Sequence, residues 1–591
     1  MGYGRLGGPT EPPDRPNQPP PYAPSRKRPR ALLLSVVLSV TLLIASAIAA
    51  TLFFLLGPDA AGSSAMRRHP SKAIAKACEK TRYPTLCVDS LVDFPGALAA
   101  SEPDLVHISV NMTLQRFGRA LYATSDLTNL PMDSLLRCAY DDCLELLDDS
   151  VDALTQSLSS VLGESEDKSS SAAEDAVTWL SAALTNHDTC TDGLELVSSG
   201  GSIKNQMVEH LKELAELVSN SLAIFSATSG GDDFSGIPIQ NRRRRLSTMK
   251  MEYPKWMTRK DRNLLNLPVS EIQADIVVSK DGNGSACKTI REAIKKAPEH
   301  SKRRTIIYVK EGRYEEKMLK VGKKKKNLMF IGDGMGKTVI TGRKNILDHN
   351  ITTFKTASFA STGAGFIARD ITFENYAGPQ KHQAVALRVG GDHSVIYRCN
   401  ITGYQDTLYV HSQRQFYREC EIYGTVDFIF GNAAVVFQNC SMYARKPMDQ
   451  QKITITAQNR KDPNQNTGIS IHDCRILAQP DLEAAKANFS TYLGRPWKLY
   501  SRTVYMLSFI GDHVHPRGWL EWNATFALDT LYYGEYMNYG PGAGLMQRVT
   551  WPGYHIITSA AKAKKFTVAR FIHGSTWLPS TGVAYLAGLS G

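Results

Sequence analysis

The pattern of hydrophobic and polar positions divides the chain into stretches with different periods. Residues 31–56 contain no charged side chain. Between residues 70 and 228, apolar side chains recur every three or four positions, which is typical of amphipathic helices. From residue 271 onward, short β-branched and aromatic runs alternate with turn residues, which indicates an all-β region. The runs predicted as strands include 305–309, 328–332, 338–342, 366–373, 395–399 and 468–472. The sequence therefore predicts an apolar segment, a helical domain and a β domain, in that order.

The N-terminal residues have the composition of a membrane-targeting region. Residues 1–30 are rich in proline and glycine, which predicts a disordered tail, and they end in the basic cluster Arg26–Arg30. The uncharged residues 31–56 are long enough to span a bilayer, which takes about 20 residues. We expect an uncleaved transmembrane signal-anchor, with a long cleavable signal as the alternative. The basic cluster predicts a cytosolic tail and a lumenal remainder, hence a type II membrane precursor in the secretory pathway (Golgi).

The remaining features agree with a lumenal chain. N-x-Ser/Thr sequons occur at Asn111, Asn283, Asn350, Asn400, Asn439, Asn488 and Asn523. The 10 cysteines form no C-x-x-C pair, and no histidine-rich cluster accompanies them. We therefore expect disulfides rather than a zinc site, and neither a metal nor a cofactor.

Residues 70–228 are predicted to form a four-helix bundle. The apolar positions form one series from Leu136 to Leu158, one from Ile203 to Phe225 and a shorter one from Val177 to Leu184. A further helix is expected around Leu105–Leu121. We interpret these stripes as core packing and not as a cofactor site.

Charge is distributed unevenly between the two halves of the chain. Residues 57–241 carry 12 Lys and Arg against 27 Asp and Glu, whereas residues 246–591 carry 47 against 28. This asymmetry indicates that the halves contact each other, or that the basic half binds a polyanion such as nucleic acid or an acidic polysaccharide. The linker 229–270 contains Arg242–Leu246, four arginines before a leucine, which we interpret as a protease processing site. The run Lys323–Lys326 is interpreted as a solvated turn that would also attract an acidic polysaccharide.

A weak internal repeat identifies the β region as a solenoid. A triplet of cysteine, polar residue and apolar residue begins at Cys399, Cys420, Cys440 and Cys474. The first three triplets are 21 and 20 residues apart, and the last gap of 34 is consistent with an inserted loop. Such a period with short strands predicts a β-solenoid rather than a sandwich. The spacing leaves open whether Cys420 pairs with Cys399 or with Cys440.

Two aspartates are expected to face each other on neighbouring coils. Asp406 and Asp427 are 21 residues apart, and one coil of a parallel β-helix advances about 4.8 Å. Gln383 and Gln405 should lie on the same face, one coil apart. Two carboxylates this close cannot both ionise easily, so we expect one protonated acid and one ionised base or nucleophile.

The spacing of this pair and the rest of the chain argue against several other functions. Inverting glycosidases hold their carboxylates roughly 6.5–9.5 Å apart, more than one coil provides. A calcium-dependent pectate lyase would need more clustered carboxylates. A catalytically silent wall-binding protein would lack part of the constellation, and a free inhibitor would lack the β half.

Five motifs in residues 271–591 resemble those of plant pectin methylesterases (pectinesterases). They are Gly312-Arg-Tyr-Glu-Glu316, Gln383-Ala-Val-Ala386, Gln405-Asp-Thr-Leu408, Asp427-Phe-Ile-Phe-Gly431 and Leu493-Gly-Arg-Pro-Trp497. The resemblance implies an all-β right-handed parallel β-helix. It also implies a carboxylic ester hydrolase that demethylesterifies pectin (homogalacturonan methyl esters) to pectate and methanol.

The resemblance also implies a role for each matching residue. The implied catalytic residues are Asp427 as nucleophile, Asp406 as general acid and base, Gln383 and Gln405 as the oxyanion hole, and Arg495 as the partner of the nucleophile. The implied substrate contacts are Thr353, Gln383, Arg495 and Trp497. The family disulfide would be Cys420–Cys440, with Cys399 reduced. His349 and Leu499 depart from the family's usual residues, which affects substrate subsites only.

The helical half resembles the plant invertase/pectin methylesterase inhibitor family. The hairpin from Cys78 to Cys87, and the segment Asp142-Cys143 with Asp188-Thr-Cys190, carry this resemblance. It implies the disulfides Cys78–Cys87 and Cys143–Cys190, with Cys138 left over. It also implies a pro-region that inhibits or retains the precursor until cleavage.

These interpretations predict the binding partners of the protein and its location. The expected partners are methylesterified pectin, the chain's own pro-region or separate inhibitor proteins, a processing protease at 242–246 and a membrane through 31–56, without nucleic acid. The mature domain is expected in the cell wall or extracellular space.

Overall fold

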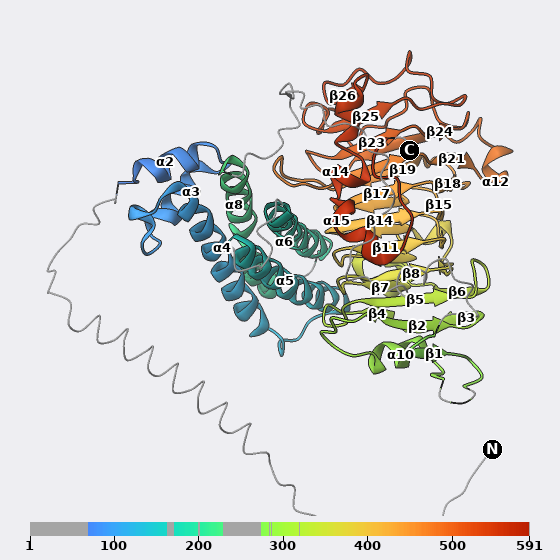
Figure 1. The fold of residues 1–591 in the computed structure, drawn as a ribbon, viewed down its shortest axis with the longest axis horizontal. Helices are drawn as coiled ribbons and strands as arrows, with labels where there is room; N and C mark the ends of the chain where they lie inside the picture. The colour runs from blue at the N-terminus through green and yellow to red at the C-terminus, as the bar shows by residue number, and fades with distance from the viewer. Residues whose placement is uncertain are drawn as a thin grey trace, which may run out of the picture. The chain divides into compact units, whose positions relative to one another are not determined.

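A computed structural model describes residues 69–161, 171–198, 201–228 and 273–589, except 283, 285 and 318. Within these ranges a helical half precedes a β half (Figure 1). None of the helices in these ranges is long and apolar enough to cross a membrane. The predicted tail 1–30, the predicted anchor 31–56 and the predicted processing site 242–246 lie outside the described residues.

The helices of the first half are α2 (Lys72–Glu79), α3 (Pro84–Val92), η1 (Ala97–Ala99), α4 (Glu102–Ser125), α5 (Ser134–Val161), α6 (Ser171–Glu195), α7 (Gly201–Leu211) and α8 (Leu214–Thr228). Helix α4 contacts α5 and α8, and α6 contacts the same two, so these four form the predicted bundle. A capping box of Ser101 and Asp104 begins α4.

Two details of the helical half bear on the predictions. The single helix predicted from Ile203 to Phe225 is two helices, because Glu213 has a left-handed backbone (φ 64°) that ends α7 before α8 begins. The disulfides Cys78–Cys87 and Cys143–Cys190 are both present, and Cys138 is free, as predicted.

The β half winds through three parallel sheets. In spatial order, the eleven-stranded sheet contains β1 (Ile276–Val278), β2 (Thr305–Val309), β5 (Leu328–Gly332), β8 (Ile367–Arg369), β11 (Ser394–Tyr397), β14 (Arg414–Arg418), β17 (Ala434–Gln438), β20 (Gly468–His472), β23 (Arg502–Met506), β25 (Tyr532–Tyr536) and β26 (Tyr554–Ile556). The seven-stranded sheet contains β22 (Thr491–Pro496), β19 (Ile453–Gln458), β16 (Ile429–Gly431), β13 (Leu408–Val410), β10 (Leu387–Val389), β7 (Phe359–Ser361) and β4 (Leu319–Val321). The eight-stranded sheet contains β24 (Phe509–Ile510), β21 (Arg475–Ala478), β18 (Ser441–Ala444), β15 (Glu421–Gly424), β12 (Asn400–Thr402), β9 (Thr372–Asn375), β6 (Thr338–Gly342) and β3 (Gly312–Glu315).

Short helices connect or cover these strands. They are α10 (Ile290–Lys296), α11 (Ile346–His349), η3 (Thr353–Lys355), η4 (Pro379–Lys381), α12 (Pro480–Glu483), α13 (Ala560–Lys564), α14 (Val568–Phe571), α15 (Gly574–Trp577) and η5 (Leu578–Thr581). The last four, coloured red in Figure 1, pack against the outer face of the eleven-stranded sheet through an apolar cluster.

The registers confirm the repeat that the sequence predicted. Ile401 pairs with Ile422, Ile422 with Met442, and Met442 with Ile476, so the four triplets stack on successive coils. The run 366–373, predicted as one strand, is divided into β8 and β9 by a left-handed residue, Asp370.

The predicted disulfide between Cys420 and Cys440 is not formed. Both residues, like Cys399, are buried free thiols. The Cys420 thiol donates to the carbonyl of Ile396 (3.3 Å), and the backbone amide of Cys440 donates to the sulfur of Cys474 (3.4 Å). One-coil spacing stacks the cysteines, but it does not decide whether a pair of sulfurs is bonded.

Candidate active site

Asp406 and Asp427 occupy equivalent positions on neighbouring coils. Each precedes a strand of the seven-stranded sheet, β13 and β16, and Leu408 of one strand pairs with Ile429 of the other. The backbone amide of Asp406 donates to the carbonyl of Val426 (3.0 Å). Both aspartates are buried and have left-handed backbones (φ 58° and 49°), a conformation that non-glycine residues rarely adopt. The fold therefore holds both carboxyl groups at the spacing of one coil, about 5 Å.

Asp427 is fixed by two partners from later coils. Arg495 binds it through both ends of its guanidinium, Nε to Oδ1 at 2.8 Å and Nη2 to Oδ2 at 2.6 Å. The hydroxyl of Thr454 donates to Oδ1 at 2.6 Å and accepts from the backbone amide of Asp427 at 2.9 Å. A bidentate arginine stabilises the ionised carboxylate and fixes its plane. Asp427 is therefore held in one orientation by Arg495 and Thr454.

Asp406 lies in the opposite electrostatic environment. Burial raises the pKa of its carboxyl group well above the ordinary range, the negative charge of Asp427 raises it further, and Arg495 offsets only part of this. Asp406 therefore retains a proton at pH values where an exposed aspartate is ionised. The two carboxyl groups thus differ: that of Asp406 retains its proton, and that of Asp427 is paired with Arg495.

Gln383 and Gln405 lie beside the pair. The backbone amide of Ala384 donates to the carbonyl of Gln405 (3.2 Å), which places the two glutamines on adjoining coils. Both are half-buried, and within the described residues neither side-chain amide has a hydrogen-bond partner. Two amide donors are therefore available to an oxygen bound next to the aspartates.

An aromatic surface connects the two predicted substrate contacts. The Trp497 ring lies 6.0 Å from Phe430, which stacks on Tyr409 at 4.2 Å. Tyr409 meets the edge of Phe354 at 6.5 Å, and half-buried Thr353 directly precedes Phe354 in η3. Thr353 and Trp497 thus mark the two ends of one apolar surface along the seven-stranded sheet.

Sequence reasoning missed two residues that contact the site. Thr454 supports the nucleophile, but it lies 27 residues after Asp427, and this irregular coil hides it from a 21-residue period. Trp522 stacks on the Arg495 guanidinium at 4.4 Å from a loop without repeat pattern. Only the alternation of apolar and polar residues at 453–458 could have indicated that Thr454 lies on a strand with its side chain on one face.

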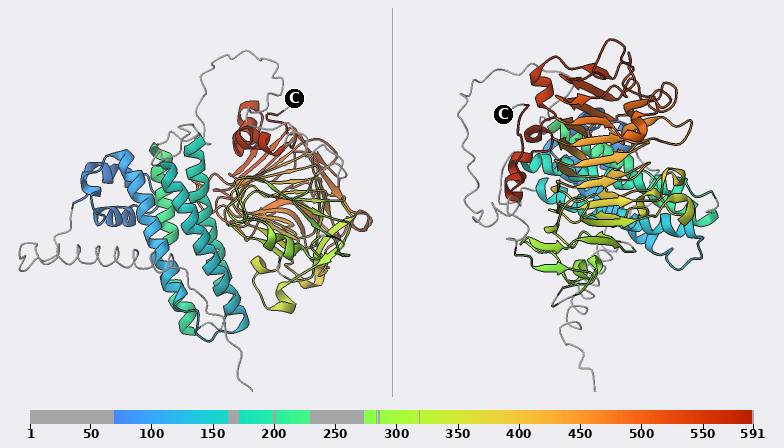
Figure 2. Two further views of the ribbon diagram at one scale, coloured as in Figure 1. Left: turned by 60° about the horizontal axis from the view of Figure 1, so that its bottom comes forward. Right: turned by 90° about the vertical axis from the view of Figure 1, so that its right-hand side faces the viewer.

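The bundle packs on the same sheet face. Figure 2 shows α5 and α6 alongside the β-helix. Helix α6 contacts a residue that follows Asp406, Asp427 or Arg495 by three to five positions in each case. The contacts are Thr189 with His411 (2.9 Å), Thr185 with Asn432 (2.9 Å) and Asp192 with Lys498 (2.9 Å). Phe354, Tyr409 and Phe430 share one apolar cluster with bundle residues. The bundle therefore covers the surface next to the aspartate pair.

The prediction of a solvated turn at 323–326 is wrong for its first residue. The Lys323 ammonium group binds Asp148 at 2.5 Å and Asp152 at 2.7 Å on α5. Only 27 % of its side chain is exposed. The acidic bundle and the basic half therefore contact each other here, as the charge asymmetry suggested.

Known proteins resemble both halves. The family model described as Pectinesterase matches residues 275–575, and that of the plant invertase/pectin methylesterase inhibitor matches residues 72–224. "Probable pectinesterase/pectinesterase inhibitor 34" of Arabidopsis thaliana is 67% identical over 557 residues, 94% of this chain and 92% of the relative. "Probable pectinesterase/pectinesterase inhibitor 61" of the same plant is 62% identical over 597 residues and 100% of both chains.

A solved structure resembles the β half alone. Pectin methylesterase from carrot is 56% identical, with a TM-score of 0.53, and the match covers 54% of this chain and 99% of that chain. A fold built from the β half alone therefore has a solved counterpart. The chain belongs to the pectinesterase family, and a domain of the plant invertase/pectin methylesterase inhibitor family precedes its esterase domain.

Proposed function

We propose that this chain demethylesterifies pectin to pectate and methanol, with Asp427 as the nucleophile. The observation that carries the proposal is the pair of unlike carboxyl groups: Asp427 bound by Arg495, beside buried Asp406 with its raised pKa. The enzyme is a carboxylic ester hydrolase.

The first half of the reaction forms an acyl-enzyme. Asp427 attacks the carbonyl carbon of a galacturonate methyl ester, and the ester oxygen becomes an oxyanion. The amides of Gln383 and Gln405 donate to this oxyanion, and one such donor is worth about 3–4 kcal/mol. Asp406 gives its proton to the departing methoxy group, which leaves as methanol. The acyl-enzyme is a mixed anhydride between Asp427 and the galacturonate carboxyl group.

The second half of the reaction regenerates the enzyme. Asp406, now ionised, removes a proton from a water molecule, and this water attacks the anhydride. The bond to Asp427 breaks, so that the carboxylate returns to Arg495 and pectate is released. Thr353 and Trp497 contact the neighbouring sugars on the aromatic surface.

The bundle is proposed to inhibit the uncleaved chain. Its helix α6 covers the residues that follow Asp406, Asp427 and Arg495, where the polysaccharide would lie. Ion pairs such as Asp192–Lys498 hold it there. A separate inhibitor protein of the same family would compete for this face.

Processing and transport complete the proposal. Cleavage within 242–246 would release the esterase domain from the pro-region, and residues 31–56 would anchor the precursor in the secretory pathway. The composition of these segments supports both steps. The sequons support a glycosylated, secreted mature domain that acts in the cell wall.

One experiment tests the activity and its inhibition together. A specific protease site replaces residues 242–245, and methanol release from methylesterified pectin is measured before and after cleavage. We expect cleavage to raise methanol release strongly above the residual rate of the uncleaved chain, and no release with Asp427→Asn. Asp473→Asn is the matched control, because Asp473 is an exposed aspartate with the same left-handed backbone on another corner. Equal rates for the cleaved wild type and Asp427→Asn would refute the proposal.

A further inference from the structure

Two arginines lie in one column of the seven-stranded sheet. The registers align Arg388 with Tyr409, Tyr409 with Phe430, Phe430 with Ala457, and Ala457 with Arg495. Arg388 is therefore four coils from Arg495, about 19 Å along the axis. A polysaccharide that follows the aromatic surface away from the nucleophile passes over Arg388.

Arg388 is buried without a hydrogen-bonded carboxylate among the described residues, although the negative charges of Glu145 and Asp142 act on it through space. Its side chain is 3 % exposed, and its guanidinium lies over the Phe354 ring at 3.3 Å from the centroid. Neither Nε nor Nη1 has a hydrogen-bond partner among the described residues. Leaving a buried charged donor unsatisfied is costly, and the planar fork of arginine matches a carboxylate. The position of Arg388 is therefore suited to binding a carboxylate.

Two lysines extend the positive charge along the same surface. Lys320 aligns with Ala360, which aligns with Arg388, so Lys320 continues the column. Lys355 lies in η3, one residue after Phe354, on which Arg388 stacks. Both lysines are largely buried in the uncleaved chain, each ion-paired with α5.

A row of carboxylates on α5 covers these cations. Asp142, Glu145, Asp149 and Asp152 recur at three- and four-residue steps, so they share one face of the helix. Each step advances about 4.5–6 Å, which gives an evenly spaced line of carboxyl groups.

The first two carboxylates of the row meet the lysines directly. Glu145 binds Lys320 at 2.6 Å, and Asp142 binds Lys355 at 2.9 Å. Burial raises the pKa of Glu145, but the charges of Arg388, Lys320 and Lys355 outweigh it and hold the pKa at about 2. Glu145 is therefore the carboxylate that the cations stabilise most.

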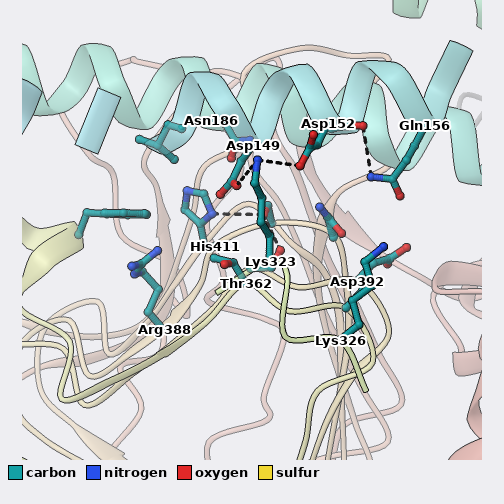
Figure 3. A pocket seen from close by; sticks show the side chains of 17 residues that line it. Asp149, Asp152, Gln156, Asn186, Lys323, Lys326, Thr362, Arg388, Asp392 and His411 are labelled. Carbon is teal, nitrogen blue, oxygen red and sulfur yellow. Dashed lines mark hydrogen bonds and ion pairs between the residues drawn. The ribbon is translucent and has the colours of Figure 1, made fainter. Parts of the chain in front are cut away.

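A cavity remains between α5 and the sheet. It has a volume of about 100 Å³, and its lining includes Lys323, Arg388 and His411 (Figure 3). Figure 3 draws Lys323 reaching up to Asp149 and Asp152, whereas no dashed line reaches Arg388. The helix thus forms ion pairs with the lysines, whereas Glu145 and Asp142 act on Arg388 only through space.

We propose that Arg388, with Lys320 and Lys355, binds the free carboxylates of de-esterified galacturonate units, and that the acidic row of α5 occupies this site in the uncleaved chain. The inference rests on the proposed function, because the reaction itself converts neutral methyl esters into such carboxylates. When a de-esterified stretch of the polysaccharide binds at Arg388, a methyl ester on the same strand is placed at Asp427. The site therefore favours pectin that already carries de-esterified units.

The test compares two ligands that differ only in charge. The chain is cut in the linker, and its β half, which matches the solved carrot chain alone, is separated from the bundle at high salt. Binding of a fully de-esterified oligogalacturonate and of its fully methylesterified counterpart is measured by calorimetry, with oligomers longer than the roughly 19 Å between the arginines. Asp427→Asn in every sample prevents turnover of the esterified ligand.

Arg388→Gln is expected to raise Kd for the de-esterified oligomer about ten- to hundredfold, with a much smaller change for the esterified one. Arg388→Lys should recover part of the loss, because it keeps the charge but not the fork. Arg475→Gln, an exposed arginine on the eight-stranded sheet, is the matched control and should not change either Kd. Thermal melting of each variant shows that the fold is intact.

Two results would overturn the inference. One is an unchanged Kd for the de-esterified oligomer in Arg388→Gln. The other is an equal loss of affinity for both oligomers, which would show that Arg388 maintains the shape of the groove and does not bind a carboxylate. The proposed function fails separately, if the folded β half with Asp427 intact releases no methanol from pectin. The calorimetry does not depend on that reaction, so the two failures are distinguishable.

Discussion

Arg495 and Arg388 share a column of one sheet but not an electrostatic role. Each guanidinium lies over an aromatic ring, Trp522 for Arg495 and Phe354 for Arg388. Arg495 binds a carboxylate of its own domain, Asp427, through two hydrogen bonds, whereas Arg388 has none to Nε or Nη1. The same residue type in the same register therefore binds an aspartate at one end, whereas at the other end two of its donors have no partner among the described residues.

The pKa shifts of the two arginines show the same contrast. Burial lowers the pKa of both, but Asp427 more than compensates at Arg495, whose pKa is raised. At Arg388 burial dominates and the pKa is lowered, although Glu145 and Asp142 of α5 oppose it. An anion that binds beside such a buried cation offsets the free-energy cost of burying its charge, as in an anion-binding site.

The largest expected effect follows removal of the catalytic arginine. Arg495→Gln should lower kcat on methylesterified pectin about a thousandfold, because Asp427 loses the partner that keeps it ionised and oriented. Arg388→Gln should instead act mainly on KM for partly de-esterified pectin. Steady-state kinetics of the cleaved chain measures both, and a similar kcat loss in the two variants would remove the distinction between the arginines.

The next effect tests whether ester chemistry is confined to the Arg495 end. Gln383→Ala should reduce kcat about 10²–10³-fold with little change in KM, since the amide donates only to the transition-state oxyanion. The measurement is methanol release at saturating pectin. Gln413→Ala, on the loop that follows β13, is the comparison variant, and an equal loss there would contradict the oxyanion role.

A smaller effect is expected from the α5 side of the contact. Glu145→Gln should increase methanol release by the uncleaved chain about tenfold, because Lys320 and Lys355 lose the carboxylate that faces them. Glu209→Gln, at an exposed site on α7, is the control. An uncleaved Glu145→Gln chain as inactive as wild type would show that this ion pair does not hold the bundle in place.

The smallest expected effect is on stability and depends on pH. The raised pKa of Asp406 means that the native state binds its proton more tightly than the unfolded chain does. The contribution to stability is complete below the unfolded pKa, about 3.9, and is lost as pH rises through the native pKa. Asp406→Asn should therefore raise Tm by a few degrees at pH 7 and leave it unchanged near pH 3.5, while it abolishes activity. Coincident melting curves at pH 7 would contradict the assignment.

The sequence allowed most of the β half to be predicted, and the exceptions have a physical cause. The strands at 305–309, 328–332, 338–342 and 468–472 were predicted with their observed bounds. The break at Asp370 and the kink at Glu213 were missed, because a left-handed backbone at an ordinary residue leaves no trace in hydrophobic periodicity.

The contacts between the halves show a second kind of limit. The charge asymmetry predicted that the acidic and basic halves would meet, but not which side chains would do so. Lys323 was interpreted as solvated because its partners, Asp148 and Asp152, lie 175 and 171 residues before it in the sequence, on the bundle. Contacts between residues so distant in sequence depend on how the two halves pack together, which no local sequence pattern encodes.

By itself the sequence determined the repeat of about 21 residues, and with it the juxtaposition of Asp406 and Asp427, because one coil of a β-helix sets one distance. Only the tertiary structure decided which groups surround that pair. It joined Thr454 to Asp427 across an irregular coil, left Cys420 and Cys440 as thiols, and buried Arg388 beneath α5 without a partner. The reason is that a period fixes positions along the axis, whereas hydrogen bonds, sulfur pairing and burial depend on side-chain directions and on what packs against each face.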